Sequence, residues 1–115
     1  MNRDILLNYK HINTEYSTQQ TNTVVWTPAA SSRFVITDLI VGVDSITDGS
    51  IIIFDETNAT ANYIFRQEVK PSTQGPHRFI EHYVVPFVSA AVNNSVKVTT
   101  TNGIVFRIQI HGYEI

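Results

Sequence analysis

The last fourteen residues, NGIVFRIQIHGYEI, alternate between large apolar and polar side chains with a period of two. The apolar positions are Ile104, Phe106, Ile108 and Ile110. The polar positions between them are Arg107, Gln109 and His111. Because successive side chains of a strand point to opposite faces, one face of this segment is predicted to join a core. Burial of four such side chains, at about 1.5–3 kcal/mol each, would anchor the strand firmly, so deleting the last eight residues is expected to unfold the domain.

Further segments rich in Val, Ile, Thr, Phe and Tyr precede this one, with short groups of turn residues between them. The eight predicted strands are Ile5–Ile12, Thr23–Thr27, Arg33–Val43, Ser50–Phe54, Asn62–Val69, His77–Pro86, Ser95–Thr100 and Ile104–Gly112. No segment has helical periodicity over ten residues. Eight short strands that each bury one face favour two packed sheets over a closed barrel. The predicted fold is therefore an all-β antiparallel β-sandwich, jelly-roll-like, with an immunoglobulin-like topology as the second choice.

Two dipeptides predict how strands connect. Asn102-Gly103 suits a type I′ turn, whose two central residues both need positive φ, so the last two strands are predicted to form a hairpin. Asp48-Gly49 suggests a second hairpin with a longer loop between Arg33–Val43 and Ser50–Phe54, in an Asx-type turn with Gly49 at positive φ.

The 115 residues correspond to one domain. Within it, residues 1–22 are predicted to form an N-terminal strand and a polar arm, and residues 23–115 the β-sandwich. Residues 13–22, NTEYSTQQTN, hold almost no large aliphatic side chain, so they are interpreted as a loop or an arm that needs a partner surface.

Composition excludes several classes of protein. There is no cysteine, which rules out disulfides and thiolate chemistry. Eight Lys and Arg residues against ten acids give a net charge of −2, without the basic surplus of a nucleic-acid binder. No stretch approaches the about 20 apolar residues of a membrane-spanning helix, and the N-terminus lacks the pattern of a signal peptide. We therefore expect no nucleic-acid partner, no membrane partner and no export signal.

The search for catalytic or metal-binding residues yields no motif. His77 and His82 have opposite parity on one predicted strand, so they cannot chelate one ion together. A cross-strand site formed by His11 and His111 stays open. Asp44–Gly49 lacks the ligand spacing of a calcium-binding EF-hand loop. Neither a nucleophile motif nor a phosphate-binding loop occurs, so we predict no enzyme, no metal and no cofactor, and a cupin-like metalloenzyme remains only the third hypothesis.

Aromatic and loop residues are the candidates for binding. Trp26, the single tryptophan, suits either a core position between sheets or a platform on which a sugar ring or a partner stacks. The residues predicted to contact a partner or a glycan are Tyr9, Tyr16, Trp26, Asp44, Asp48 and Asn58. In a carbohydrate-binding module, Tyr63 and Tyr83 would be further stacking candidates.

Residues 20–115 resemble, in the order of their features, small virion proteins of tailed bacteriophages: capsid decoration or cement proteins and head-fibre bases built on a compact β-sandwich. The segments that carry the resemblance follow a polar N-terminal stretch and are Thr27–Val41 (TPAASSRFVITDLIV), Gly49–Asp55 (GSIIIFD), Thr57–Thr60 (TNAT), Val96–Gly103 (VKVTTTNG) and His111–Glu114 (HGYE). These are strand and turn patterns, so no site residue is transferred from the family.

The resemblance implies a structural protein on the outside of an icosahedral capsid, decorating or cementing the shell. Its implied partners are the major capsid protein and further copies of itself, with a trimer as the first expectation. The implied location is the virion surface, after synthesis in the host cytoplasm. A carbohydrate-binding, lectin-like module or fibre-associated adhesion domain is the alternative function, with surface glycans as the ligand.

Overall fold

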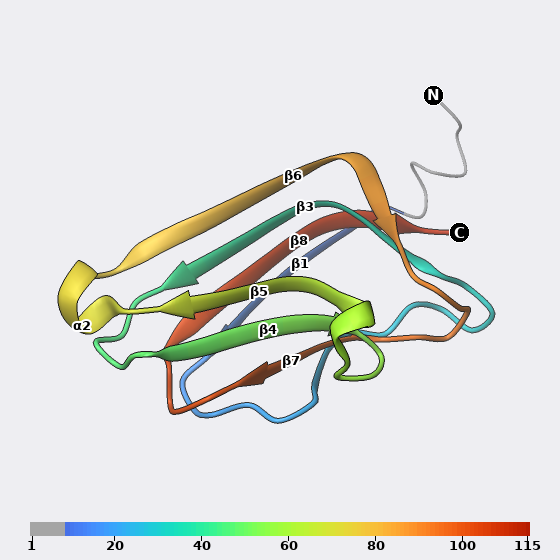
Figure 1. Cartoon of the computed structure of the whole chain (residues 1–115). Helices are drawn as coiled ribbons and strands as arrows, with labels where there is room; N and C mark the ends of the chain where they lie inside the picture. Colours follow the sequence, from blue (N-terminus) through green and yellow to red (C-terminus); the bar gives the residue numbers. More distant parts are fainter. Residues whose placement is uncertain (1–8) are drawn as a thin grey trace.

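The structure is a computed structural model, and it describes residues 9–115. It contains eight strands in two four-stranded antiparallel sheets (Figure 1). The strands are β1 (Tyr9–Tyr16), β2 (Thr23–Trp26), β3 (Phe34–Val43), β4 (Gly49–Asp55), β5 (Tyr63–Val69), β6 (His77–Val88), β7 (Val96–Thr100) and β8 (Phe106–Glu114). Two short helical turns, η1 (Thr60–Asn62) and α2 (Pro71–Gln74), flank β5. Residues 5–8 of the first predicted strand lie outside the described residues.

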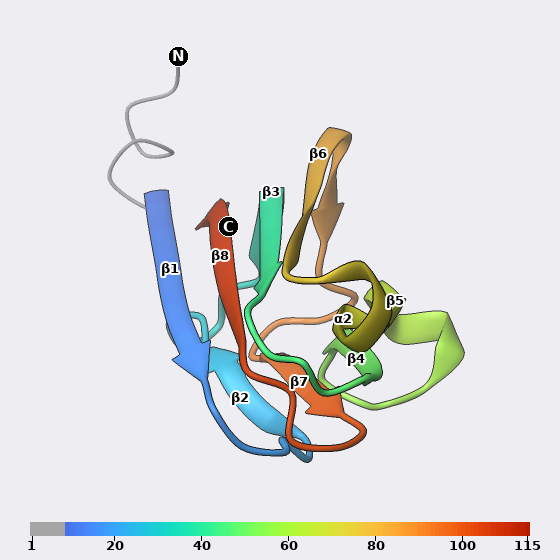
Figure 2. The same ribbon diagram turned by 90° about the vertical axis from the view of Figure 1, so that its left-hand side faces the viewer.

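The first sheet has the strand order β1-β8-β3-β6, and the second sheet has the order β2-β7-β4-β5. Consecutive strands therefore lie in opposite sheets, except β4 and β5, which pair with each other in the second sheet. These two strand orders are those of a jelly roll, so the predicted fold class is confirmed. The first sheet places β8 between β1 and β3, which makes the C-terminal strand a central one (Figure 2).

Both predicted hairpins are wrong, because each pair of strands is divided between the two sheets. Asn102 has a φ of 68°, but Gly103 does not take the positive φ that a type I′ turn requires. Gly49 does not have a positive φ either. Its lack of a side chain has another reason, since a Cβ at Gly49 would collide with the backbone oxygen of Thr101. The turn residues bend the chain from one sheet to the other.

The polar segment 13–22 is largely part of the sandwich. Its first four residues continue β1, which pairs with β8 from Tyr9 opposite Tyr113 to Tyr16 opposite Phe106. The remaining residues are also fixed to the body, because the backbone N–H of Thr100 donates to the Gln20 carbonyl at 2.9 Å. The prediction of a loop or arm over residues 13–22 is therefore wrong for residues 13–16, whereas residues 17–22 have no regular secondary structure. β1 is an edge strand, and its polar side chains alternate with partly buried ones.

The hydrophobic core fills the space between the two sheets. The prediction that one face of the C-terminal segment joins the core is confirmed. Its four large apolar side chains are fully buried: Ile104, Phe106, Ile108 and Ile110. They meet side chains from the central strands β3, β4 and β7, including Leu39, Val41, Ile51, Ile53, Val96 and Val98. Trp26 is 5% exposed, and its ring lies 5.7 Å from that of Phe34. The tryptophan is thus a core residue in this structure.

Two buried carboxylates hold loops against this core. Asp55, at the end of β4, accepts bonds from the Ser89 hydroxyl, the Ala90 backbone N–H and the Asn94 side-chain amide at 2.8–3.1 Å. Glu114, near the end of β8, accepts bonds from Trp26 and Ala29. Because each carboxylate has its hydrogen-bonding partners, its burial leaves no unsatisfied oxygen among the described residues.

Candidate functional site: the outer face of the first sheet

The outer face of the first sheet carries rows of residues in register across all four strands, and most of their side chains are polar. The apolar side chains at alternate positions of β8 point into the core, so Arg107, Gln109 and His111 between them face outward. The strand pairing extends each of them into a row. One row is Glu15, Arg107, Gly42 and Arg78, the next is Asn13, Gln109, Ile40 and Ile80, and the third is His11, His111, Asp38 and His82.

The third row brings together three of the four histidines. His11 and His111 lie directly opposite each other, with ring centroids 4.4 Å apart, so the cross-strand neighbours considered from the sequence do meet. His111 Nδ1 also lies 2.6 Å from the hydroxyl of Tyr9. Nδ1 of His82 lies 2.5 Å from Oδ1 of Asp38. The hydrogen bond with His82 holds the pKa of Asp38 below its usual value.

This row has the residue types of a metal site without the required geometry. Among residues 9–115, no three His, Asp or Glu side chains converge in a way that could hold a metal ion. A row across a sheet spaces neighbouring positions by about 5 Å, so its two ends lie too far apart to share an ion. The fourth histidine is separate: His77 Nδ1 bonds to the Gly75 carbonyl at 2.8 Å, and its ring contacts Phe79.

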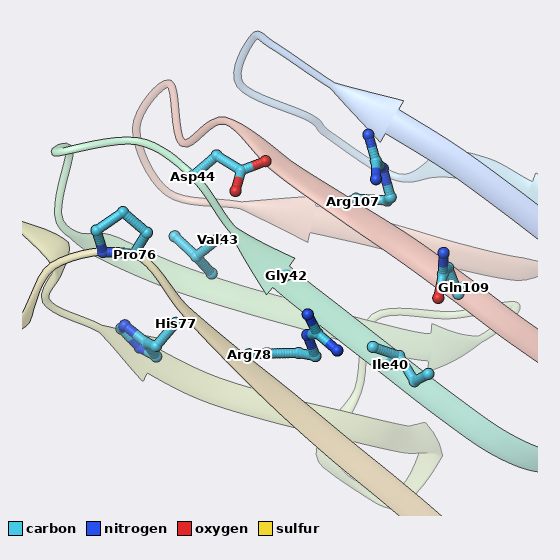
Figure 3. A pocket seen from close by; sticks show the side chains of 9 residues that line it. All are labelled: Ile40, Gly42, Val43, Asp44, Pro76, His77, Arg78, Arg107 and Gln109. Carbon is cyan, nitrogen blue, oxygen red and sulfur yellow. The ribbon is translucent and has the colours of Figure 1, made fainter.

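A pocket of about 350 Å³ opens on the same face where the arginine row crosses β3 (Figure 3). It is lined by Ile40, Gly42, Val43, Asp44, Pro76, His77, Arg78, Arg107 and Gln109. Gly42 forms the floor between the two arginines, which are its direct neighbours on β8 and β6. Arg107 donates to Glu15 at 3.0 Å. Arg78 forms no ion pair with any residue in the described part of the chain.

The free edge of β6 is a second feature of the first sheet. β3 pairs Ile36 with Phe87 and Asp38 with His82, so residues 83–86 of β6 have only Thr37 opposite them. This excess of residues makes β6 bend sharply away from its neighbour (Figure 1). At the bend, Val84 is 90% exposed and Val85 is 82% exposed. We call residues 83–86 the β6 tip.

The β6 tip is fixed to the sandwich by Tyr83. The Tyr83 side chain packs against the core, and its hydroxyl donates to the Ile64 carbonyl at 3.4 Å. Burial, together with the nearby negative charge of Glu81, raises the pKa of Tyr83 to about 12. Tyr83, the first residue of the β6 tip, therefore fixes the tip to the core, while Val84 and Val85 face solvent.

The six contact residues nominated from the sequence do not gather into one site. Asp44 lines the pocket, and Tyr9 joins the histidine row. Trp26 is buried, so its ring offers no face for stacking, and Tyr16 is partly buried with one face of its ring stacked on Phe106. Asp48 bonds to Ser72 on α2, whereas Asn58 lies beyond the other end of β4. Whether any of the six contacts a partner or a glycan stays a prediction.

Sequence reasoning missed the residues that build the pocket: Gly42, Arg78, Arg107 and Gln109. Arg107 and Gln109 were predicted to lie on the outer parity of their strand, which is confirmed. Gly42 could have indicated the pocket from the sequence, because a glycine inside an apolar strand often marks a place where another group approaches the backbone closely. The two arginines are 29 positions apart in the chain, and only the strand order places both beside Gly42.

Comparisons with known proteins do not assign a family. No family model matches the chain, and no curated protein matches it. Among solved structures, the chain is similar to the cryo-EM structure of the extra small virus (XSV) VLP of the giant freshwater prawn Macrobrachium rosenbergii. That similarity has a TM-score of 0.41 and 10% sequence identity, and it covers 92% of this chain and 77% of the other. Membership of the tailed-phage proteins therefore stays a prediction.

The helices of the described region are too short to cross a membrane.

Proposed function

We propose that this protein is a structural component of a virion, carried on the outer surface of a phage capsid where it decorates or cements the shell. The observation that carries this proposal is the β6 tip, which presents two adjacent valines almost fully to solvent from a sheet edge. A free sheet edge with exposed apolar side chains is a ready contact for another chain. The resemblance seen in the sequence supports the same function.

The rest of the molecule suits a scaffold. Jelly rolls occur in viral capsid proteins and in lectins, so the fold alone supports both candidate functions and decides neither. In the described residues the outer polar groups stand in rows that run across the strands of the first sheet. Catalysis needs groups that converge on one reacting atom, and this arrangement does not favour it.

The proposed partner at the β6 tip is the major capsid protein, with other copies of this chain as the second contact in a homo-oligomer, a trimer first. Val84 and Val85 would insert into an apolar depression on the shell, while Tyr83 keeps the tip in position. Burial of two valines supplies about 3–6 kcal/mol before the cost of association. Contacts of this strength, repeated over many copies, suit a high-copy shell protein.

The first experiment is a copy count by quantitative mass spectrometry on particles purified from the source, relative to the major shell protein. Hundreds of copies per particle are expected. A handful would indicate a fibre or receptor-binding protein, and complete absence would overturn the virion assignment.

The second experiment tests the tip itself on particles that lack the protein. Val84→Asp combined with Val85→Asp is expected to abolish binding of the purified protein to such particles. Ile46→Asp is the matched control, because Ile46 is also highly exposed but lies in the β3–β4 loop. Equal binding of both variants would overturn the role of the tip, and the conclusion from the copy count would still stand.

The alternative function, a carbohydrate-binding or adhesion module centred on Trp26, is weakened by the burial of that ring. A lectin-like role would need a different site on this molecule.

A further inference from the structure

Gly42 differs from the other two glycines that lie within strands, Gly49 and Gly112, because no backbone contact or positive φ requires it. Glycine in a strand interior is destabilising relative to alanine, so its presence usually reflects a positive φ or a close contact. Gly112 and Gly49 have such a reason, since a Cβ at either position would collide with backbone oxygens. Gly42 has no positive φ, and a Cβ built on it meets nothing within 4 Å. The space above Gly42 is therefore not demanded by packing.

The side chains around this space are suited to a negatively charged ligand. Arg78 and Arg107 are directly opposite Gly42 on its two neighbouring strands, so they stand on either side of the space. Arg107 gives one nitrogen to Glu15 and keeps further N–H donors, while Arg78 pairs with no acid among residues 9–115. The planar guanidinium group matches the two oxygens of a carboxylate.

The remaining polar groups lie along the strand from this point. Asp44 is two residues beyond Gly42, about 7 Å along the chain direction, and Gln109 lies toward Ile40 on the other side (Figure 3). Asp44 accepts hydrogen bonds and Gln109 can both donate and accept, which suits hydroxyl groups. A cavity of about 350 Å³ lies near the lower end of ligand pockets, large enough for one sugar ring.

We propose that the pocket over Gly42 binds a carboxylate-bearing sugar, of the uronic acid class. Its carboxylate would lie above Gly42 between Arg78 and Arg107, and its ring hydroxyls would face Asp44 and Gln109. The site lies on different residues from the β6 tip. The proposal goes beyond the assembly role, and neither depends on the other.

The test is an NMR titration of the whole chain with D-glucuronate, with D-glucose and N-acetylaspartate as the matched probes. Shifts confined to the backbone amides around Gly42, Arg78 and Arg107 are expected, with a Kd of about 1 mM for a ligand of this size. Equal shifts with D-glucose would overturn the carboxylate contact. Equal shifts with N-acetylaspartate would overturn the sugar class, and no localised shift would overturn the site.

Three variants separate binding from folding. Arg78→Gln is expected to weaken glucuronate binding by about tenfold. Arg66→Gln is the control, because Arg66 is an exposed arginine on β5 in the second sheet. Gly42→Val fills the space with a residue that strands favour, so it should remain folded and lose binding. Retained affinity in Gly42→Val, with an unchanged circular dichroism spectrum, would contradict the proposal.

Discussion

Nε1 of Trp26 donates a hydrogen bond of 3.2 Å to Oε2 of Glu114, and this bond joins β2 in one sheet to β8 in the other. Both side chains are buried, and the same oxygen accepts the backbone N–H of Ala29 at 3.1 Å. The tryptophan therefore connects the two sheets near the C-terminal end of β8. Of its two interpretations from the sequence, the core position is the one that the structure supports.

Replacement of this tryptophan should destabilise the whole domain. Trp26→Ala is expected to lower the free energy of unfolding by about 3–5 kcal/mol, because it removes a large buried ring and leaves the Glu114 carboxylate short of a donor. Trp26→Phe, which keeps most of the apolar volume, should cost less. Urea unfolding measures both. A Trp26→Ala protein of unchanged stability would contradict the core assignment.

Asp55 should stabilise the loop of residues 89–94, as Trp26 stabilises the contact between the two sheets. In Asp55→Asn, an NH₂ group that cannot accept a hydrogen bond replaces one carboxylate oxygen, so either the bond from Ala90 or the two bonds from Ser89 and Asn94 are lost. We expect a loss of about 2 kcal/mol in the free energy of unfolding. Asp44→Asn, at an exposed position, is the control and should change stability little. Equal effects of the two substitutions would exclude this role for Asp55.

Two glycines on neighbouring strands of the first sheet should respond in opposite ways to the same substitution. Gly112→Ala places a methyl group against the backbone oxygen of Val35, which belongs to the paired strand and cannot move aside cheaply. We expect a loss of about 3 kcal/mol or more, or failure to fold. Gly42→Ala meets no neighbouring atom and should be neutral or slightly stabilising. Thermal unfolding of the pair measures the difference, and equal melting temperatures would contradict the close contact at Gly112.

Tyr83 should make the domain sensitive to alkali. Its pKa is raised to about 12 in the folded chain, above the ordinary value of 10, so folding favours the neutral phenol. The associated stability is fully present below pH 10 and is lost as the pH rises from 10 toward 12. In a tyrosinate absorbance titration, Tyr83→Phe should remove the ionisation near pH 12, while Tyr16, whose pKa burial also raises, still ionises late. A step near pH 12 that persists in Tyr83→Phe would assign it to another residue.

The sequence was sufficient to predict the strands and the fold class, because the alternation of apolar and polar residues reports local burial. It was insufficient for connections. Asn102-Gly103 and Asp48-Gly49 marked the places where the chain turns, but a turn signal does not state which strand comes next in space. In this jelly roll the chain crosses to the other sheet at both of these turns, so both hairpin predictions were wrong. The same limit explains residues 13–16, whose polar side chains suit an edge strand as well as a loop.

The candidate site was less predictable than the fold for a related reason. Arg78, Gly42 and Arg107 become neighbours only when β6, β3 and β8 are placed side by side. No local pattern specifies that order. The sequence correctly predicted that Arg107 lies on the outer face of its strand. Its neighbours on the adjacent strands could be identified only from the strand pairing in the structure. Trp26, the most conspicuous residue of the chain, was an ambiguous guide because its size suits a core and an interface equally.

The central place of β8 in the first sheet has a consequence for how this chain folds during synthesis. β1 and β3 pair with β8 and not with each other, so β1 has no strand beside it until residues 106–114 have left the ribosome. Almost the whole chain must then be present before the first sheet can close. Pairings between segments so distant in sequence carry a high contact order, which slows folding to the range of milliseconds to seconds. We therefore expect the first sheet to form only after residues 106–114 have been synthesised, with β1 among the last strands to be secured.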